Sequence, residues 1–402
     1  MIEPKEALDI ILNNVKSLPA KKVFLEKGLG HVLVNDIKAK IEVPLFDNSA
    51  MDGFAIHKQD LGTKNCLKVI GEVKAGQKTS KVASKGKAIS IMTGAPVPKG
   101  AAAVIPIENV DEDKKKKTID IKSAANDRDN IRNKGEDIKK GSVLIKKGTI
   151  LKPIHIALAA SVGVSEVKVF EKPKVSIVVT GNELKRPGTI LKAGELYDSN
   201  SFLLKSLLLK NNFDVAYVAK TKDNLDKTIR TIRKAIEKAD VVLTTGGISV
   251  GKYDFVSLAL EKIGAKRFFN KVKQKPGKPL SFFTYQNKAI ISLPGNPVAV
   301  ATCFEIYAKP MLKKMSGTND LAHKEIKAEA AQPLKRHKKR TNYIRVNLIK
   351  KNGSYVAKTT GFQGSGVLSS MLADGIAVLQ KGNENLKQGE LVKVIDLEGN
   401  YK

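Results

Sequence analysis

Thr244-Thr-Gly-Gly-Ile-Ser-Val-Gly-Lys-Tyr-Asp254 decides the fold, because it lies between an apolar run, Ala239–Leu243, and an amphipathic run, Phe255–Ile263. This order is typical of a strand, a glycine-rich turn and a helix. The N–H groups of such a turn can point at one anion, at a helix start whose dipole favours negative charge. The stretch therefore predicts a phosphate-binding turn. A Walker-type nucleotidase is disfavoured, since Tyr253 stands where Ser or Thr must reach Mg²⁺.

The same alternation of strands and helices extends on both sides of this turn. Strands are expected at 175–180, 215–219, 241–244 and 280–285, and helices at 201–210, 225–238 and 255–263. This pattern predicts a central three-layer α/β domain with a mostly parallel sheet. Ligands of such sheets bind at the carboxyl ends of the strands. Thr180-Gly-Asn-Glu-Leu184 and the glycine-rich turn lie at two of those ends.

Other segments differ in texture from the α/β part. Apolar residues at helical spacing predict an amphipathic helix over 3–17. Short β-type runs broken by Gly, Pro and Asn predict a β-rich domain from about Pro44 to Asp137, and similar runs after Met315 predict a small C-terminal β domain.

Length and composition indicate a folded chain of several domains. It has 402 residues, 42% of them hydrophobic, which is enough to bury roughly two to four cores. Its two cysteines, Cys66 and Cys303, form no disulfide framework and fit a reducing, cytoplasmic setting. No signal-like or membrane-spanning run is visible, so we expect a protein without membrane attachment.

The formal charge of +31 points to an anionic partner, such as a nucleic acid, an anionic membrane or a phosphorylated small molecule. Specific nucleic-acid binding is not expected, because aromatic residues make up only 5% of the chain and Trp is absent. The densest basic runs, 114–117 and 337–340, are interpreted as solvated surface.

Two further turns and several carboxylates carry polar chemistry. Lys275-Pro-Gly-Lys-Pro279 holds two cations on a kinked turn, which suits an oxyanion. Pro294-Gly-Asn-Pro297 suits an anion site or simply a helix start capped by Asn296. The carboxylates are Glu183, Asp254, Asp47 and Asp52. Each could hold Mg²⁺ beside a phosphate or merely cap a helix or turn, and Asp254 is a good N-cap candidate.

Eight motifs in one order extend this pattern over the whole chain. They are Phe46-Asp-Asn-Ser-Ala-Met-Asp-Gly-Phe54, Met92-Thr-Gly-Ala-Pro96, Gly135-Glu-Asp137, Thr180-Gly-Asn-Glu-Leu184, Asp198-Ser-Asn200, Gly246-Gly-Ile-Ser-Val-Gly251, Lys275-Pro-Gly-Lys-Pro279 and Pro294-Gly-Asn-Pro297. Each motif is weak alone, but together they closely resemble the molybdopterin molybdenumtransferase family.

The resemblance implies an activity and an architecture. The activity is insertion of molybdate into the dithiolene of adenylylated molybdopterin, with AMP release and a divalent metal, Mg²⁺. The implied domains are an elongated one (1–43 and 140–172), the β-rich one (44–139), the α/β one (173–318) and a C-terminal β barrel (319–402). A homodimer whose site is shared between protomers is also implied, and molybdopterin adenylyltransferase is the implied upstream partner.

The resemblance also assigns roles to individual residues. It implies a catalytic role for Asp52, Thr93, Asp137 and Glu183, and metal binding by Glu183 and Asp254. Pterin and phosphate binding would fall to Gly246, Gly247, Ser249, Gly251, Lys275, Lys278, Ser199, Asn200, Pro294 and Pro297. Two positions depart from the family pattern: Asn182 stands where many relatives have Asp, and Lys252 where an acidic or small residue is common.

Two rival functions remain open from sequence. A binding or scaffolding protein could keep the fold without turnover, but the presence of Asp52, Glu183 and both lysines argues against it. A protein that binds nucleic acid through charge alone would lose affinity steeply with salt and ignore the pterin.

Overall fold

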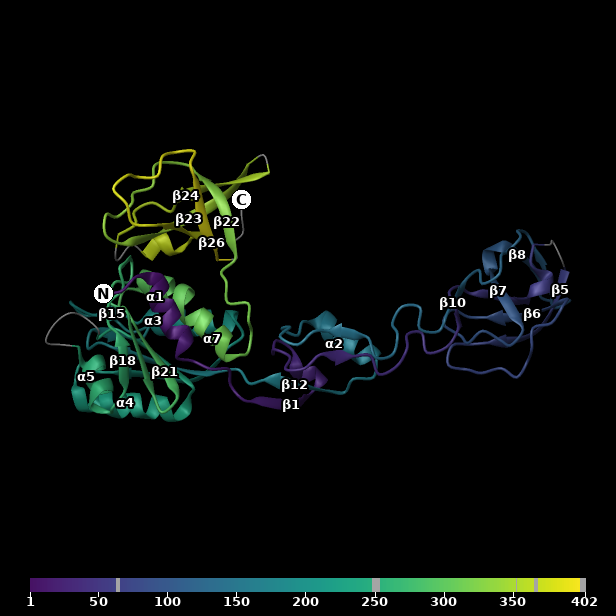
Figure 1. Ribbon diagram of the computed structural model, residues 1–402, viewed down its shortest axis with the longest axis horizontal. Helices are drawn as coiled ribbons and strands as arrows, with labels where there is room; N and C mark the ends of the chain where they lie inside the picture. Colours follow the sequence, from purple (N-terminus) through teal and green to yellow (C-terminus); the bar gives the residue numbers. More distant parts are fainter. Residues whose placement is uncertain (63–65, 248–253, 352, 365–367, 398–402) are drawn as a thin grey trace.

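The computed structural model describes residues 1–62, 66–247, 254–351, 353–364 and 368–397. Figure 1 shows an α/β part with a β barrel above it, an extended middle part, and a β-rich part at the far end. The middle part lies between the β-rich part and the α/β part of the same chain. The prediction of a multidomain protein built from α/β and β units is confirmed.

A six-stranded sheet in the order β16-β13-β17-β21-β20-β18 forms the centre of the α/β part. The first four strands pair in parallel, whereas β20 is antiparallel to both of its neighbours. The strands are β13 (Lys174–Thr180), β16 (Asp214–Thr221), β17 (Val241–Thr245), β18 (Lys266–Phe269), β20 (Ser281–Tyr285) and β21 (Lys288–Leu293). The mostly parallel sheet that the sequence predicted is therefore confirmed.

Helices cover both faces of this sheet and complete the three layers. They are α3 (Asn200–Lys210), α6 (Pro297–Cys303) and α7 (Lys309–Met315) on one face, and α4 (Leu225–Lys238) and α5 (Phe255–Lys262) on the other. Leu243 packs toward the first face and its neighbour Val242 toward the second, and both are fully buried. Burial on both faces explains why β17 begins with three consecutive apolar residues.

The N-terminal helix α1 (Pro4–Asn13) packs on the α/β part rather than on the middle part. Ala7 and Ile11 are fully buried there, in the same cluster as Met311 and Met315 of α7. The amphipathic spacing predicted the helix but not the surface against which it packs. The exact domain bounds stay a prediction, and α1 is the element on which they depend most.

The middle part consists of short elements from two distant stretches of sequence. They are β1 (Ala20–Phe24) paired with β12 (Glu166–Phe170), β2 (Ile37–Lys38) paired with β11 (Val143–Ile145), and α2 (Pro153–Ser161). The β-rich part is inserted between them. Where the chain leaves and re-enters the middle part, Val43 N–H donates to Ile138 O at 2.9 Å and Ile138 N–H to Val43 O at 3.0 Å. The insertion thus begins and ends at one place.

The β-rich part contains a six-stranded sheet in the order β7-β4-β6-β5-β9-β8. Its strands are β4 (Gly53–His57), β5 (Cys66–Val73), β6 (Lys87–Ile91), β7 (Ala101–Pro106), β8 (Val110–Asp113) and β9 (Thr118–Ile121), with β3 (Asn48–Ser49) paired to β10 (Ile131–Arg132) nearby.

The C-terminal part is a closed barrel, as predicted. Five strands pair in the order β23-β24-β22-β26-β25, and β25 pairs back to β23. They are β22 (Glu325–Ala330), β23 (Thr341–Lys351), β24 (Ser354–Thr359), β25 (Gly375–Leu379) and β26 (Leu391–Asp396). A short strand of the α/β part, β19 (Gln274–Lys275), adds to β23 in parallel. In the described part of the chain, no helix is both long and apolar enough to span a membrane.

Candidate functional site

A cavity of about 630 Å³ opens where the parallel strands β13, β17 and β21 end. The carboxyl ends of these neighbouring strands meet at one edge of the sheet, where ligands of α/β proteins bind. Six of the residues singled out from the sequence line this cavity: Glu183, Gly246, Gly247, Lys275, Lys278 and Pro294. The fold thus brings together residues that are far apart in the sequence.

The start of the glycine-rich turn is pressed against the end of β13. Gly246 has a φ of 81°, and a Cβ there would lie 2.4 Å from the Thr180 carbonyl oxygen. Any side chain at this position would displace the turn from the strand, so glycine is required on two grounds. Ser249, Gly251 and Lys252 lie outside the described residues, and the roles expected for the first two stay predictions.

Asn200 is hydrogen-bonded to the start of this turn and to the Pro294-Gly-Asn-Pro297 turn. The residue is 7% exposed, and its Nδ2 donates to Thr245 Oγ1 at 3.0 Å and to Gly295 O at 2.7 Å. Thr245 Oγ1 in turn donates to Pro294 O at 2.7 Å. Asn200, expected as a pterin ligand, therefore holds two turns of the cavity in place. Its neighbour Ser199 is exposed just before α3.

The Pro294-Gly-Asn-Pro297 turn begins α6, as one of the two sequence interpretations predicted. Asn296 Oδ1 accepts from Ala299 N–H at 3.2 Å, and Pro297 is the first helical residue. The helix start therefore accounts for Asn296 and Pro297, while Pro294 and Asn296 both line the cavity. The binding roles expected for Pro294 and Pro297 stay predictions.

The lysine turn provides cationic side chains that line the same cavity. Lys275 and Lys278 are exposed and line the cavity, whereas Gln274, directly before them, is fully buried. Arg340 adds a third cation to the lining, which also contains two carboxylates, those of Glu183 and Asp223. Positive charge thus exceeds negative charge among the described lining residues, which suits an anion.

Arg340 and Gln363 reach the cavity from the C-terminal barrel, and sequence reasoning missed both. Arg340 belongs to the basic run 337–340, which was interpreted as solvated surface. In the structure its Nε donates to His337 Nε2 at 3.1 Å, so the guanidinium is held in place by its own run. A lysine-rich run ending in arginine was the only sequence signal.

Of the two candidate metal ligands, one lines the cavity and the other caps a helix. Glu183 lines the cavity, whereas Asp254 caps α5, its Oδ1 accepting from Ser257 N–H at 3.0 Å. The prediction that Asp254 is an N-cap is confirmed, and its metal role stays a prediction. Within the described ranges, no three His, Cys, Asp or Glu residues gather closely enough to form a metal site by themselves.

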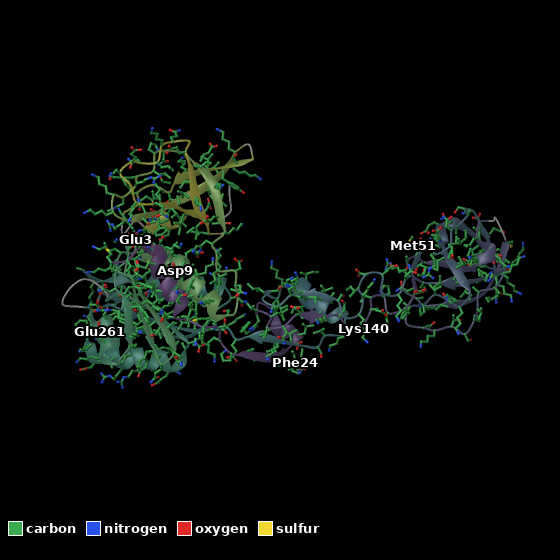
Figure 2. All side chains as sticks on the ribbon, in the orientation of Figure 1. Glu3, Asp9, Phe24, Met51, Lys140 and Glu261 are labelled. Carbon is green, nitrogen blue, oxygen red and sulfur yellow. The ribbon has the colours of Figure 1, made fainter. Side chains whose placement is uncertain are left out.

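The remaining predicted catalytic residues lie in or next to the distant β-rich part. Asp52 Oδ1 accepts from Thr93 N–H at 2.6 Å and from Thr93 Oγ1 at 2.8 Å. The backbone bond foremost, and the hydroxyl bond next, lower the pKa of the Asp52 carboxyl, which keeps it ionised. Figure 2 labels the preceding residue, Met51, on the β-rich part, far along the molecule from the α/β part.

Asp137 is exposed on the segment that returns to the middle part, where its N–H donates to Val43 O at 3.1 Å. Asp47, the other carboxylate of the motif containing Asp52, is paired with Arg128 at 2.7 Å and accepts from Lys134 N–H. Asp47 therefore fixes a loop. Asp52 and Thr93 are brought together. Within one chain, the β-rich part that holds them lies apart from the α/β part that holds Glu183 and the lysines.

Three family models match successive stretches of the chain. They are the MoeA N-terminal region (domain I and II) over residues 2–163, a probable molybdopterin binding domain over 176–314, and the MoeA C-terminal region (domain IV) over 327–397. A molybdopterin molybdenumtransferase of Staphylococcus aureus (strain COL) is 35% identical over 400 residues, which span 98% of this chain and 95% of that protein. The chain belongs to the molybdopterin molybdenumtransferase family.

Further relatives of this family agree. A molybdopterin molybdenumtransferase of Staphylococcus epidermidis is 33% identical over 405 residues, covering 99% of this chain and 96% of its own length. The crystal structure of a molybdopterin biosynthesis MoeA protein from Pyrococcus horikoshii superposes with a TM-score of 0.82 at 30% identity, over 99% of this chain and all of that one. The resemblance indicated by the motifs is confirmed, and so is the prediction of an enzyme of the molybdopterin molybdenumtransferase family, which acts in molybdenum cofactor biosynthesis.

Proposed function

We propose that the chain inserts molybdate into the dithiolene of adenylylated molybdopterin and releases AMP. The observation that carries this proposal is the cavity at the carboxyl edge of the sheet, which is lined by Lys275, Lys278, Arg340 and Glu183. A pyrophosphate-linked substrate and an oxyanion both need such a cationic wall. Membership of the molybdopterin molybdenumtransferase family supports the choice of pterin and metal.

The residues of the chain have distinct tasks in this reaction. Lys275 and Lys278 bind the phosphates through charge-assisted hydrogen bonds, and the glycine-rich turn offers N–H groups to the same anion. These contacts hold the phosphoanhydride for in-line attack by water on the pterin phosphate, in which a new P–O bond forms and AMP leaves with the bridging oxygen. A divalent ion such as Mg²⁺, when bound, neutralises charge on the phosphate oxygens. Its candidate protein ligands are Glu183 and Asp254, because Mg²⁺ usually takes one or two carboxylates plus substrate oxygens.

Asp52 acts, in this proposal, from a second protomer. It is ionised and held by Thr93, and it lies in a different part of the chain from Glu183. A homodimer that places the β-rich part of one protomer over the α/β part of the other would unite the two carboxylates. The proposed reaction takes place in the cytoplasm, and a molybdopterin adenylyltransferase supplies the substrate as the upstream partner.

The direct test incubates the purified protein with adenylylated molybdopterin, molybdate and Mg²⁺. We expect AMP release measured by chromatography, together with molybdenum bound to the pterin by mass spectrometry. Pterin binding without AMP release would instead favour the scaffolding alternative. Salt-sensitive binding to DNA or RNA with no response to pterin would favour the nucleic-acid alternative.

A further inference from the structure

We propose that Gln274 is a positioning residue: its buried side-chain amide fixes the turn that carries Lys275 and Lys278. The inference rests on the proposed function, in which these two lysines bind the substrate phosphates. Gln274 is fully buried, although the lysines that follow it are exposed. A buried amide must satisfy its donors and its acceptor inside the protein.

The amide of Gln274 meets that requirement by bonding to the lysine turn and to the core beneath it. Its Nε2 donates to Pro276 O at 3.1 Å and lies 3.4 Å from Cys303 Sγ. Its Oε1 accepts from the Tyr307 hydroxyl. The orientation of the amide is defined by these partners, because only the NH₂ group can donate to a carbonyl oxygen.

Steric contact reinforces the hydrogen bonds. Gly277, between the two lysines, has a φ of 90°, and a Cβ there would lie 2.5 Å from Cys303 Sγ and 2.6 Å from Gln274 Nε2. The turn is therefore pressed directly onto the Gln274 amide and the Cys303 thiol. Burial raises the pKa of that thiol to about 12, so it stays neutral beneath the lysines.

The strand that carries Gln274 also connects the turn to the C-terminal barrel. Tyr307, the partner of the amide, is buried in the same cluster as Tyr343 of the barrel strand β23. Gln274 itself pairs with Thr341 of β23, whose N–H donates to Lys273 O at 2.9 Å. The cation Arg340 directly precedes this pairing in sequence. Gln274 thus fixes the lysines relative to the third cation of the cavity.

Loss of the Gln274 amide should release the lysine turn without dismantling the fold. The test uses sulfate, which keeps its charge between pH 5.5 and 8, as a probe of the lysine turn by titration calorimetry. In Gln274→Leu we expect sulfate affinity to fall roughly tenfold at every pH, because the ammonium groups of Lys275 and Lys278 are no longer held in the binding geometry. Tyr307→Phe, which keeps the bond to Pro276, should lose less. Thermal melts of each variant report on folding.

Gln274→Glu keeps the length of the side chain and makes its bond to Pro276 depend on protonation. When neutral, a glutamic acid can donate to Pro276 O and accept from Tyr307; when ionised, it can only accept. We therefore expect sulfate affinity near the wild-type value at low pH and a progressive loss as pH rises, while wild-type affinity stays level. This variant also tests the proposal if the Leu variant does not fold.

Three outcomes would overturn the proposal: wild-type affinity in a folded Leu variant, no recovery of the Glu variant at low pH, or no sulfate binding by the wild type. The same wild-type protein is assayed for AMP release. Sulfate binding without AMP release would refute the proposed function and leave the positioning role of Gln274 intact, so the two failures are distinguishable.

Discussion

Mixed dimers give a direct test of whether the proposed site is shared between two protomers. Asp52 and Glu183 lie in separate parts of one chain, with the middle part between them. Asp52→Asn and Glu183→Gln should each inactivate the homodimer, because each removes a carboxylate from every site. In a dimer of one Asn variant and one Gln variant, a shared arrangement places both lesions in one site and leaves the other intact.

The expected magnitude follows from this count. Mixed dimers isolated through two different affinity tags should regain about half of the wild-type rate, and an unsorted refolded mixture about a quarter, for a closed two-fold dimer. AMP release is the assay, and native mass spectrometry confirms the composition of the dimers. Isolated mixed dimers as inactive as their parents would refute the shared site while leaving the chemistry open.

A matched control dimer should be inactive if sites are shared and active if they are not. A double variant carrying both Asp52→Asn and Glu183→Gln is paired with a wild-type protomer. If sites are shared, each site receives one lesion, and the mixed dimer is inactive. If each site lies within one chain, the wild-type protomer keeps its own site, and about half of the activity remains.

Three further predictions concern single residues. Lys275→Ala should weaken sulfate or pterin binding by about 1.5 kcal/mol, roughly tenfold, through loss of a charge-assisted hydrogen bond; unchanged affinity in titration calorimetry would remove the lysine from the site. Thr93→Val should raise the pKa of Asp52 toward its ordinary value, because the hydroxyl bond that lowers it is lost. Because the pKa of Asp52 is lower in the folded protein than in the unfolded chain, the stability that its ionised form provides is present at neutral pH and is lost as pH falls through the folded pKa. An NMR titration that gives Asp52 the same pKa in the wild type and in Thr93→Val would contradict the role of the hydroxyl bond. Asn224→Ala should lower the free energy of unfolding by about 1 kcal/mol, because Asn224 Oδ1 caps α4 through Lys227 N–H at 3.0 Å; equal denaturation midpoints would contradict this.

The α/β part was predictable because its signals are local. The helix expected over 225–238 coincides with α4 (Leu225–Lys238), since Asn224 supplies a cap and buried residues recur at helical spacing. Strand ends carrying Gly-rich or charged turns were likewise visible in the sequence. Their convergence at one edge follows from the parallel sheet, which explains why Glu183 and Gly246 line one cavity.

The contributions of other parts to the cavity could not be predicted in the same way. Arg340 and Gln363 reach it only because the barrel docks beside the lysine turn, and docking depends on contacts between distant segments. The packing of α1 on the α/β part is another such contact, since its spacing specifies an apolar face but no partner. Asn200 was chosen for its motif, but its role in joining two turns depends on tertiary structure.

The order of folding is a consequence of the paired connection at Val43 and Ile138. Strands β2 and β11 pair although they are roughly a hundred residues apart in sequence, and closing so long a flexible loop costs on the order of 4 kcal/mol of chain entropy. A folded insertion brings its own two ends together and removes most of that cost. We therefore expect the β-rich part to fold before the middle part closes. A substitution that slows folding of the β-rich part would then also delay pairing of β2 with β11, although it touches neither strand.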